Sequence, residues 1–232
     1  MEKRTLRINY ALLVLLILFT VGHLILNILP LKWLASTCFV VLAFVNFFYT
    51  KKAKPEKTKA ALCMLTGMIL AMGGDVSINF NFVAGAAAFA LGHVFYFITY
   101  CVIERFRKSD FILSFILIAI CTCFLFAAPI FEFKGLEAVA LAYCIIINFM
   151  TGKAVMNACR NRTKSNLVFA VGSVLFLISD IMLVLNSFAD TSNITHILCL
   201  SIYYPGQWVL SFGMFHLGNE PKESIKGVRN AF

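Results

Sequence analysis

Two aspartates stand inside long apolar stretches of this chain, where a carboxyl group is unfavourable. Asp75 and Asp180 each follow a mostly apolar run, whereas the other nine acidic residues, including Asp110, lie near the ends of such runs or in loops. A charged side chain at the centre of a membrane helix costs about 2.5 to 3.5 kcal/mol, so it is kept where it faces protein or water and has a function. Sixteen residues separate Lys59 from Asp75, and sixteen separate Lys164 from Asp180. At about 1.5 Å per helical residue, both carboxyls lie about 24 Å along their helices, at one depth.

Several other polar side chains are predicted at neighbouring depths, which favours a polar pocket closed by aromatic rings. Asn79 lies four residues after Asp75, and this spacing places both on one helix face. In such a pocket, a carboxyl surrounded by apolar groups can hold a proton while a hydrogen-bonded neighbour stays ionised. The predicted substrate-binding residues around the two carboxyls are Asn79, His93, Tyr96, Tyr143, Tyr203, Tyr204 and Gln207, with His23 and Asn27 as further candidates.

We therefore interpret Asp75 and Asp180 as a catalytic acid and base, with their order open. The structural alternative is that tyrosine hydroxyls or asparagine amides cap both carboxyls, which would then only fix the register of the helices. His93 and the tyrosines could likewise be hydrogen-bonding partners between helices without a chemical role. His196 is expected near the outer boundary of the membrane, away from the reaction.

Other reactive residue types do not form a recognisable site in the sequence. The eight cysteines lie mostly in apolar runs without a CxxC pair, which indicates small buried residues and not disulfides or metal ligands. Zinc needs three or four ligands, and no apolar stretch pairs histidine with a second His or Cys in a polar setting. A GxSxG elbow and a Gly-rich phosphate loop are also missing. The sequence predicts neither a metal nor a cofactor. Hydrolysis by two carboxyls is the chemistry that remains.

The composition shows which elements must position these residues. The 232 residues are 61% apolar and 13% charged, with a mean hydropathy of +0.88, whereas a soluble domain has about a quarter of its residues charged. Basic residues in short loops, without one solvated face, exclude a nucleic-acid partner. A helix needs about 20 apolar residues to cross a bilayer. We predict one all-α domain over residues 1–232 with eight transmembrane helices at roughly 8–29, 34–49, 60–79, 83–103, 111–128, 136–156, 166–188 and 195–213.

The distribution of basic residues predicts the orientation of these spans. With the N-terminus in the cytoplasm, eighteen of the twenty lysines and arginines are cytoplasmic, including Lys222, Lys226 and Arg229, and only Lys32 and Lys134 are not. We therefore expect both termini in the cytoplasm of a multi-pass protein in a bacterial inner membrane. A glycine eight residues before each aspartate hints at two parallel four-helix repeats.

The residues around the two aspartates resemble those of a known family of membrane proteins, the YhhN family. The first resemblance runs through Gly73-Gly74-Asp75-Val76, Gly85, Phe89, Gly92-His93 and Tyr96. The second runs through Gly172, Phe176, Ser179-Asp180 and Tyr203-Tyr204-Pro205-Gly206-Gln207, and Tyr143 with Met150 resembles the span between them. These motifs cover about a third of the chain, and the eight-span layout is similar throughout.

This resemblance implies the activity of lysoplasmalogenases, which hydrolyse the vinyl ether of 1-alkenyl lysophospholipids to a fatty aldehyde and a glycerophospho-alcohol. It also implies that Asp75 and Asp180 are the family's two acids. The expected partners are a lysophospholipid substrate and membrane lipid, without an obligate protein partner. A proton-coupled transporter is the main alternative, because it would also keep two intramembrane acids and could break its helices at Gly73-Gly74 and Pro205-Gly206. A receptor or scaffold that binds lipid without turnover is the second alternative.

Overall fold

The computed structural model describes residues 1–221, and helices make up 86% of this part. Apart from an isolated bridge between Phe131 and Ala189, the described residues contain no strand, so the predicted all-helical fold is confirmed. The elements in chain order are α1 (Glu2–Leu26), α2 (Leu29–Ala53), the short 3-10 helix η1 (Pro55–Lys57), α3 (Thr58–Ser77), α4 (Phe82–Ile103), α5 (Lys108–Ala127), α6 (Glu137–Arg160), α7 (Lys164–Phe188) and α8 (Ile194–Gly218).

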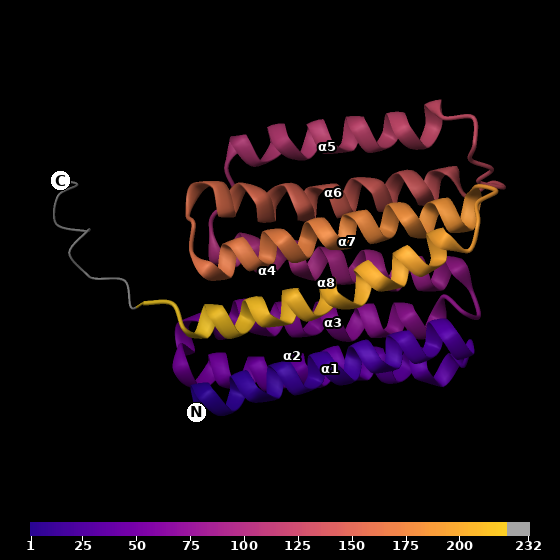
Figure 1. Ribbon diagram of the computed structural model, residues 1–232. Helices are drawn as coiled ribbons and strands as arrows, with labels where there is room; N and C mark the ends of the chain where they lie inside the picture. The colour runs from indigo at the N-terminus through magenta and orange to yellow at the C-terminus, as the bar shows by residue number, and fades with distance from the viewer. Residues whose placement is uncertain (222–232) are drawn as a thin grey trace.

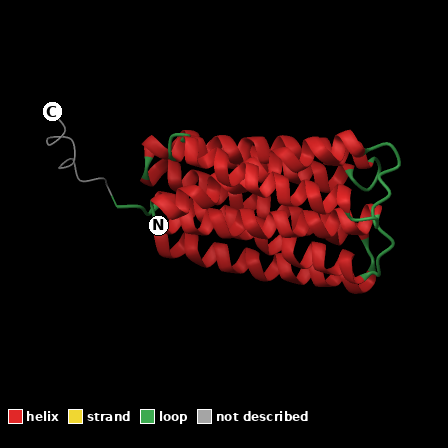
Figure 2. Ribbon diagram, turned by 90° about the horizontal axis from the view of Figure 1, so that it is seen from above, coloured by secondary structure: helices red, strands yellow, loops and turns green. Residues whose placement is uncertain are grey.

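Six helices pack in a closed ring, in the order α2, α3, α4, α6, α7 and α8, with α8 returning to α2. Outside this ring, α1 packs against α2 and α8, and α5 packs against α6. Figure 1 shows all the helices side by side along one axis, and Figure 2 shows that the connections lie at the two ends. The interior of the ring is therefore enclosed by protein, which is where polar side chains can be kept away from lipid.

Seven of the eight α-helices in residues 1–221 are long and apolar enough to cross a membrane, as expected for a multi-pass membrane protein. The exception is α8, because the face that it turns into the ring is polar. Its buried side chains include Tyr203, Tyr204, Gln207 and Ser211. By length and composition, the structure therefore supports seven of the eight predicted spans.

Several helix boundaries differ from those predicted. The second span was expected over 34–49, but α2 is 25 residues long. Pro30 lies in its first turn, where a missing N–H costs no hydrogen bond, and Lys51 and Lys52 lie in its last turn, where the helix dipole favours cations. In contrast, α3 ends at Ser77, so Asn79 lies in the turn to α4 and not on a shared helix face with the aspartate.

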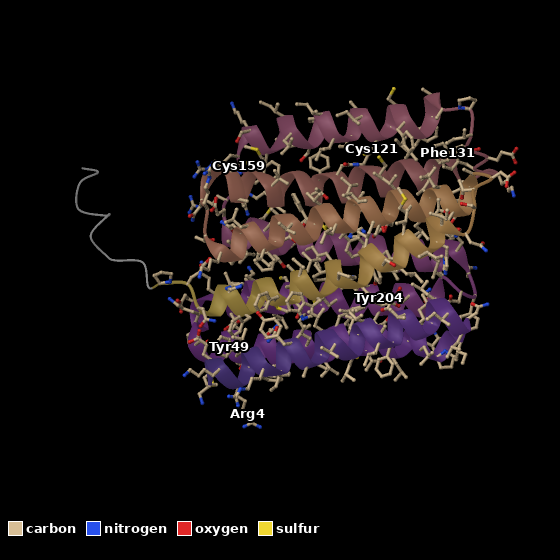
Figure 3. The ribbon with its side chains drawn as sticks, in the orientation of Figure 1. Arg4, Tyr49, Cys121, Phe131, Cys159 and Tyr204 are labelled. Carbon is tan, nitrogen blue, oxygen red and sulfur yellow. The ribbon has the colours of Figure 1, made fainter. Side chains whose placement is uncertain are left out.

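The two ends of the bundle differ in charge. We call the end that carries the N-terminus and the α2/α3, α4/α5 and α6/α7 connections the basic end, and the other one the far end. Figure 3 shows Arg4 and Cys159 toward the basic end and Phe131 toward the far end. The helix order places Lys32 and Lys134 at the far end. Of the basic residues predicted to be cytoplasmic, three lie outside the described residues: Lys222, Lys226 and Arg229.

Contrary to the sequence interpretation, many basic residues lie in helices and not in loops, and one of them is fully buried. Lys153 is inside α6 and fully buried, with its Nζ 3.0 Å from Asp110 Oδ2. Asp110 is itself fully buried in the first turn of α5 and also pairs with Arg160. These three charges join α5 to α6 at the basic end.

Candidate active site

Asp75 on α3 and Asp180 on α7 line one cavity inside the helix ring, toward the far end. The cavity is small, with a volume of about 40 Å³, and Lys32, Phe89 and Tyr203 also line it. Both carboxyls are nearly inaccessible, since Asp75 is 3% exposed and Asp180 is 7% exposed. Two buried acids at one cavity can act as proton donor and proton acceptor on a molecule bound between them.

Glycines bring the helices of the site close together. A Cβ atom on Gly67 of α3 would lie 2.5 Å from the Tyr96 ring on α4, and one on Gly172 of α7 would lie 2.7 Å from the Leu210 side chain on α8. Only glycine permits such close approach. The two tight helix pairs, α3 with α4 and α7 with α8, hold the aspartates two turns further along the same helices.

Asp75 is held by hydroxyl groups from two neighbouring helices. Ser36 on α2 donates to Asp75 Oδ2 at 2.7 Å, and Tyr203 on α8 donates to the same oxygen at 2.8 Å. Behind Tyr203, Gln207 Nε2 donates to the tyrosine oxygen at 3.3 Å, and Tyr96 donates to Gln207 Oε1 at 3.0 Å. A chain of hydrogen bonds therefore runs from Tyr96 on α4 to the Asp75 carboxyl.

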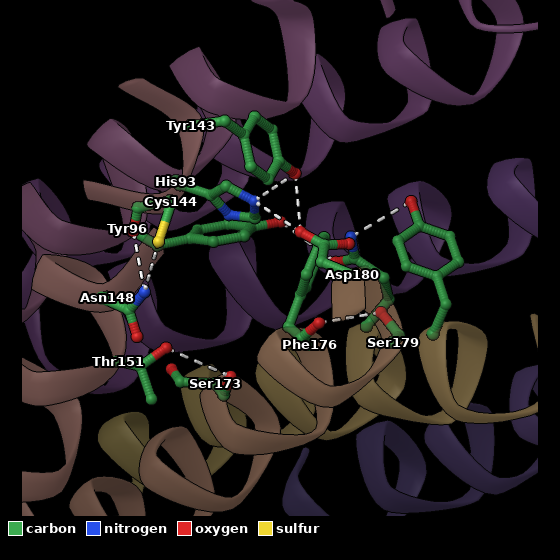
Figure 4. A network of polar contacts seen from close by, with 12 residues as sticks. His93, Tyr96, Tyr143, Cys144, Asn148, Thr151, Ser173, Phe176, Ser179 and Asp180 are labelled. Atoms are coloured by element: carbon green, nitrogen blue, oxygen red, sulfur yellow. Dashed lines mark hydrogen bonds and ion pairs between the residues drawn. The ribbon is translucent and has the colours of Figure 1, made fainter. Parts of the chain in front are cut away.

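Asp180 is held by a phenol and an imidazole, and Figure 4 shows this network. Tyr143 on α6 donates to Asp180 Oδ2 at 2.6 Å. His93 Nε2 on α4 lies 2.9 Å from the Tyr143 oxygen and 3.3 Å from Asp180 Oδ2. His93 is 1% exposed, and its Nδ1 has no hydrogen-bond partner in residues 1–221. Asp180 thus has a titratable neighbour, His93, within hydrogen-bonding distance, whereas the direct partners of Asp75 are hydroxyls.

The two carboxyls occupy corresponding places if α1–α4 is compared with α5–α8. Asp75 on α3 is bound from α2 and α8, and Asp180 on the matching α7 is bound from the matching helices α6 and α4. The helix contacts match as well, because α2–α3 corresponds to α6–α7 and α3–α4 to α7–α8. Each carboxyl therefore contacts one polar side chain from its own half and one from the other half.

Other predicted pocket residues lie around this centre without touching a carboxyl oxygen. Tyr204 donates to the backbone oxygen of Lys32 at 3.0 Å, and Asn79 accepts a hydrogen bond from Lys32 Nζ at 3.2 Å. Of the further candidates, His23 lies 3.1 Å from the backbone oxygen of Ile28, and Asn27 ends α1 with a left-handed φ of 53°. The structure therefore gives His23 and Asn27 local roles at the end of α1.

Lys32 and Ser36 belong to the site, although they were not among the predicted residues. They lie four residues apart on α2, on the face that turns into the ring, and both are buried. Their i, i+4 spacing inside an apolar stretch, together with the rarity of lysine at the far end, is the signal that could have identified them. Within residues 1–221, no group of three His, Cys, Asp or Glu side chains could hold a metal ion.

The sequence matches a known protein family. A family model described as the YhhN family matches residues 31–214, which include every residue described above as touching the carboxyls. Neither the curated proteins nor the solved structures compared with the chain give a significant match.

Proposed function

Because the chain belongs to the YhhN family, we propose that it is a membrane-embedded hydrolase that cleaves the vinyl ether of 1-alkenyl lysophospholipids. This is the lysoplasmalogenase reaction, and its products are a fatty aldehyde and a glycerophospho-alcohol. The main support is that Asp75 and Asp180 line one cavity and receive their hydrogen bonds from neighbouring side chains without a Lys or Arg partner within 4 Å in residues 1–221. Such carboxyls can exchange protons with a substrate.

The reaction needs one proton donor and one proton acceptor. The donor protonates the β-carbon of the enol ether, and the π electrons form the new C–H bond and leave an oxocarbenium ion. Water adds to the α-carbon while the acceptor takes the proton that the water loses. The resulting hemiacetal then loses its hydroxyl proton and expels the glycerol oxygen, which is protonated as it leaves. Water is the only co-reactant, so the proposed reaction requires no metal, cofactor or protein partner.

The residues around the carboxyls have distinct roles in this proposal. Tyr143 and His93 orient Asp180, and Tyr203 and Ser36 orient Asp75. The chain from Tyr96 through Gln207 fixes the direction of the Tyr203 hydroxyl. Asn79 and Tyr204 hold Lys32 at the edge of the cavity.

The proposal includes eight spans with both termini in the cytoplasm of a bacterial inner membrane. For α8, the support is its length of 25 residues and its place in the ring between α7 and α2. For orientation, the support is the concentration of lysine and arginine at the basic end. We also propose that the halves are parallel repeats, since their helix contacts and carboxyl partners correspond.

The decisive experiment incubates purified protein with matched alkenyl, alkyl and acyl lysolipids and measures aldehyde. We expect aldehyde from the alkenyl lipid alone, because only an enol ether forms the oxocarbenium ion on protonation. Changing either aspartate to asparagine should abolish aldehyde release while folding stays near normal. Aldehyde release by the variant that carries both Asp75→Asn and Asp180→Asn would refute the mechanism.

A transporter has less support in the structure. Sites of that kind use helices that are broken within the membrane, whereas α3 continues through Gly73 and Gly74 and α8 continues through Pro205. Proton uptake into proteoliposomes with a solute, without aldehyde production, would favour a transporter. Tight lysolipid binding without turnover would favour a lipid receptor.

A further inference from the structure

Lys32 is a buried cation with spare hydrogen-bonding capacity at the edge of the cavity. It is 7% exposed, and its Nζ donates to Asn79 Oδ1 at 3.2 Å. An ammonium group has three donors, and no Asp or Glu of residues 1–221 lies within 4 Å of this one. Asp75 on the same cavity interacts electrostatically with this ammonium without forming an ion pair, so the unused donors suit an anionic group of a ligand. Lys32 lines the same cavity as both aspartates.

A second pocket opens on the other side of Asp180 and is almost entirely apolar. It lies between α4, α6 and α7 and is narrow, with a cavity volume of about 40 Å³. We call it the chain pocket, and its lining includes Phe82, Ala86, Val139, Ala140, Val184 and Phe188. This pocket and the cavity share three lining residues: Asp180, Phe89 and Leu183. Asp75 lines the cavity but not the chain pocket. The order across the site is therefore Lys32 and Asp75, then Asp180, then the chain pocket.

We propose that the lysolipid binds across this site with its phosphate on Lys32 and its alkenyl chain in the chain pocket. This inference rests on the proposed function and adds the direction in which the substrate lies. A lysophospholipid has an anionic phosphate at one end and one hydrocarbon chain at the other. The site offers a cation at one end and an apolar pocket at the other, with the two carboxyls between them.

This direction assigns the two catalytic roles. From the phosphate outward, the substrate carries glycerol, the ether oxygen, the α-carbon, the β-carbon and the chain. The β-carbon therefore lies on the side of the chain pocket, where Asp180 gives it a proton. Asp75 accepts the proton of the water that adds to the α-carbon. When the hemiacetal collapses, Asp75 returns its proton to the glycerol oxygen and Asp180 takes the hydroxyl proton, so both carboxyls regain their initial states.

The phosphate site is tested by binding of lipids that cannot be hydrolysed. Lys32→Met should weaken the binding of a 1-alkyl lysophospholipid by about 10- to 100-fold, the size of effect expected for a charged hydrogen bond. The affinity of the Lys32→Met variant for 1-alkylglycerol, which lacks the phosphate, should equal that of the unaltered protein. Lys134→Met is the matched control, because Lys134 is the other lysine of the far end and is exposed. Equal losses for both lipids would overturn the proposal, since they would mean that Lys32 only maintains the fold.

The chain pocket is tested by filling it. Ala140→Phe should reduce turnover of long-chain alkenyl lysolipids more than turnover of short-chain ones, because the added ring occupies space that a long chain needs. Ala138→Phe, on the exposed face of the same helix, is the control and should preserve the preference of the unaltered protein. An unchanged chain-length preference in Ala140→Phe would overturn the placement of the chain. Elution of each variant as a single species in size exclusion checks its folding.

The order of acid and base is tested with azide, a nucleophile that needs no base. Asp75→Gly retains the proton donor, so added azide should capture the oxocarbenium ion at its α-carbon and give an α-azido ether detectable by mass spectrometry. Asp180→Gly cannot form this ion and should give none. The opposite result would reverse the proposed direction of the lipid. The binding assay does not depend on turnover, so it tests the placement of the lipid separately from the reaction. Binding of alkyl lysolipids without any release of aldehyde would reject the hydrolase function alone.

Discussion

Asp110 at the basic end and the two cavity aspartates are all buried carboxyls, but their partners differ. Asp110 pairs with Lys153 and Arg160, and it accepts a hydrogen bond from the backbone N–H of Arg107 at 2.8 Å. Lys153 Nζ also donates to the backbone oxygen of Arg105 at 3.0 Å. Asp110 therefore serves as an ion-pair partner that fastens α5 to α6.

The cavity aspartates have hydroxyl and imidazole partners and line a small cavity. Such partners allow a carboxyl to gain or lose a proton during a reaction, because within residues 1–221 neither carboxyl forms an ion pair with a Lys or Arg within 4 Å. Burial by itself therefore does not identify a catalytic acid in this protein. The chemical type of the partners, and the presence of a cavity beside the carboxyl, make the distinction.

The same substitution in both regions tests most directly whether Asp110 and the cavity aspartates have different roles. Asp180→Asn should lower aldehyde release by about 10²- to 10⁴-fold, because it removes a general acid–base group, while the melting temperature stays near that of the unaltered protein. Asp110→Asn should instead destabilise the fold by about 3 to 5 kcal/mol, because it leaves two cations unpaired, with turnover per folded molecule retained. Aldehyde assays and thermal melts in detergent measure both effects. Similar profiles for the two variants would contradict the distinction.

A smaller effect is expected from the hydroxyls that touch the carboxyls. Tyr143→Phe and Tyr203→Phe each remove one hydrogen bond to an aspartate and should lower kcat by about tenfold. The ring of each tyrosine remains, so packing and the melting temperature should change little. Tyr10→Phe is a suitable control, because Tyr10 lies on the exposed outer face of α1. A normal kcat in both site variants would show that the hydroxyls do not orient the carboxyls.

The smallest effect is expected one step further from the reaction. Gln207→Met removes the group that links Tyr96 to Tyr203 but leaves Tyr203 in contact with Asp75. Its kcat should fall by less than that of Tyr203→Phe, about two- to fivefold, since only the orientation of the tyrosine is affected. Combining both substitutions should then add little to the loss in Tyr203→Phe alone. Steady-state kinetics of the single and double variants test this coupling, and independent losses would argue against a connected chain.

Much of the site could be predicted because the depth of a residue in a membrane helix follows from its position in the sequence. Counting from the basic ends placed Asp75 and Asp180 at one level, and the structure puts both at one cavity. The predicted helix face shared by Asn79 and Asp75 is wrong, because α3 ends two residues before Asn79. The sequence also did not predict the ion pair of Asp110 with Lys153, which joins different helices. Counting along one helix gives the depth of a side chain but not its neighbours.

The amino-acid sequence alone determined that the chain forms apolar helices, that two aspartates lie deep within them and that basic residues gather at one end, because hydropathy and helical rise are local properties. Only the tertiary structure decided that α2 turns Lys32 and Ser36 toward the aspartates and that Asp180, and not Asp75, borders the chain pocket. Those features depend on how six helices close into a ring. The rotation of each helix in that ring is set by packing against helices that are distant in the sequence.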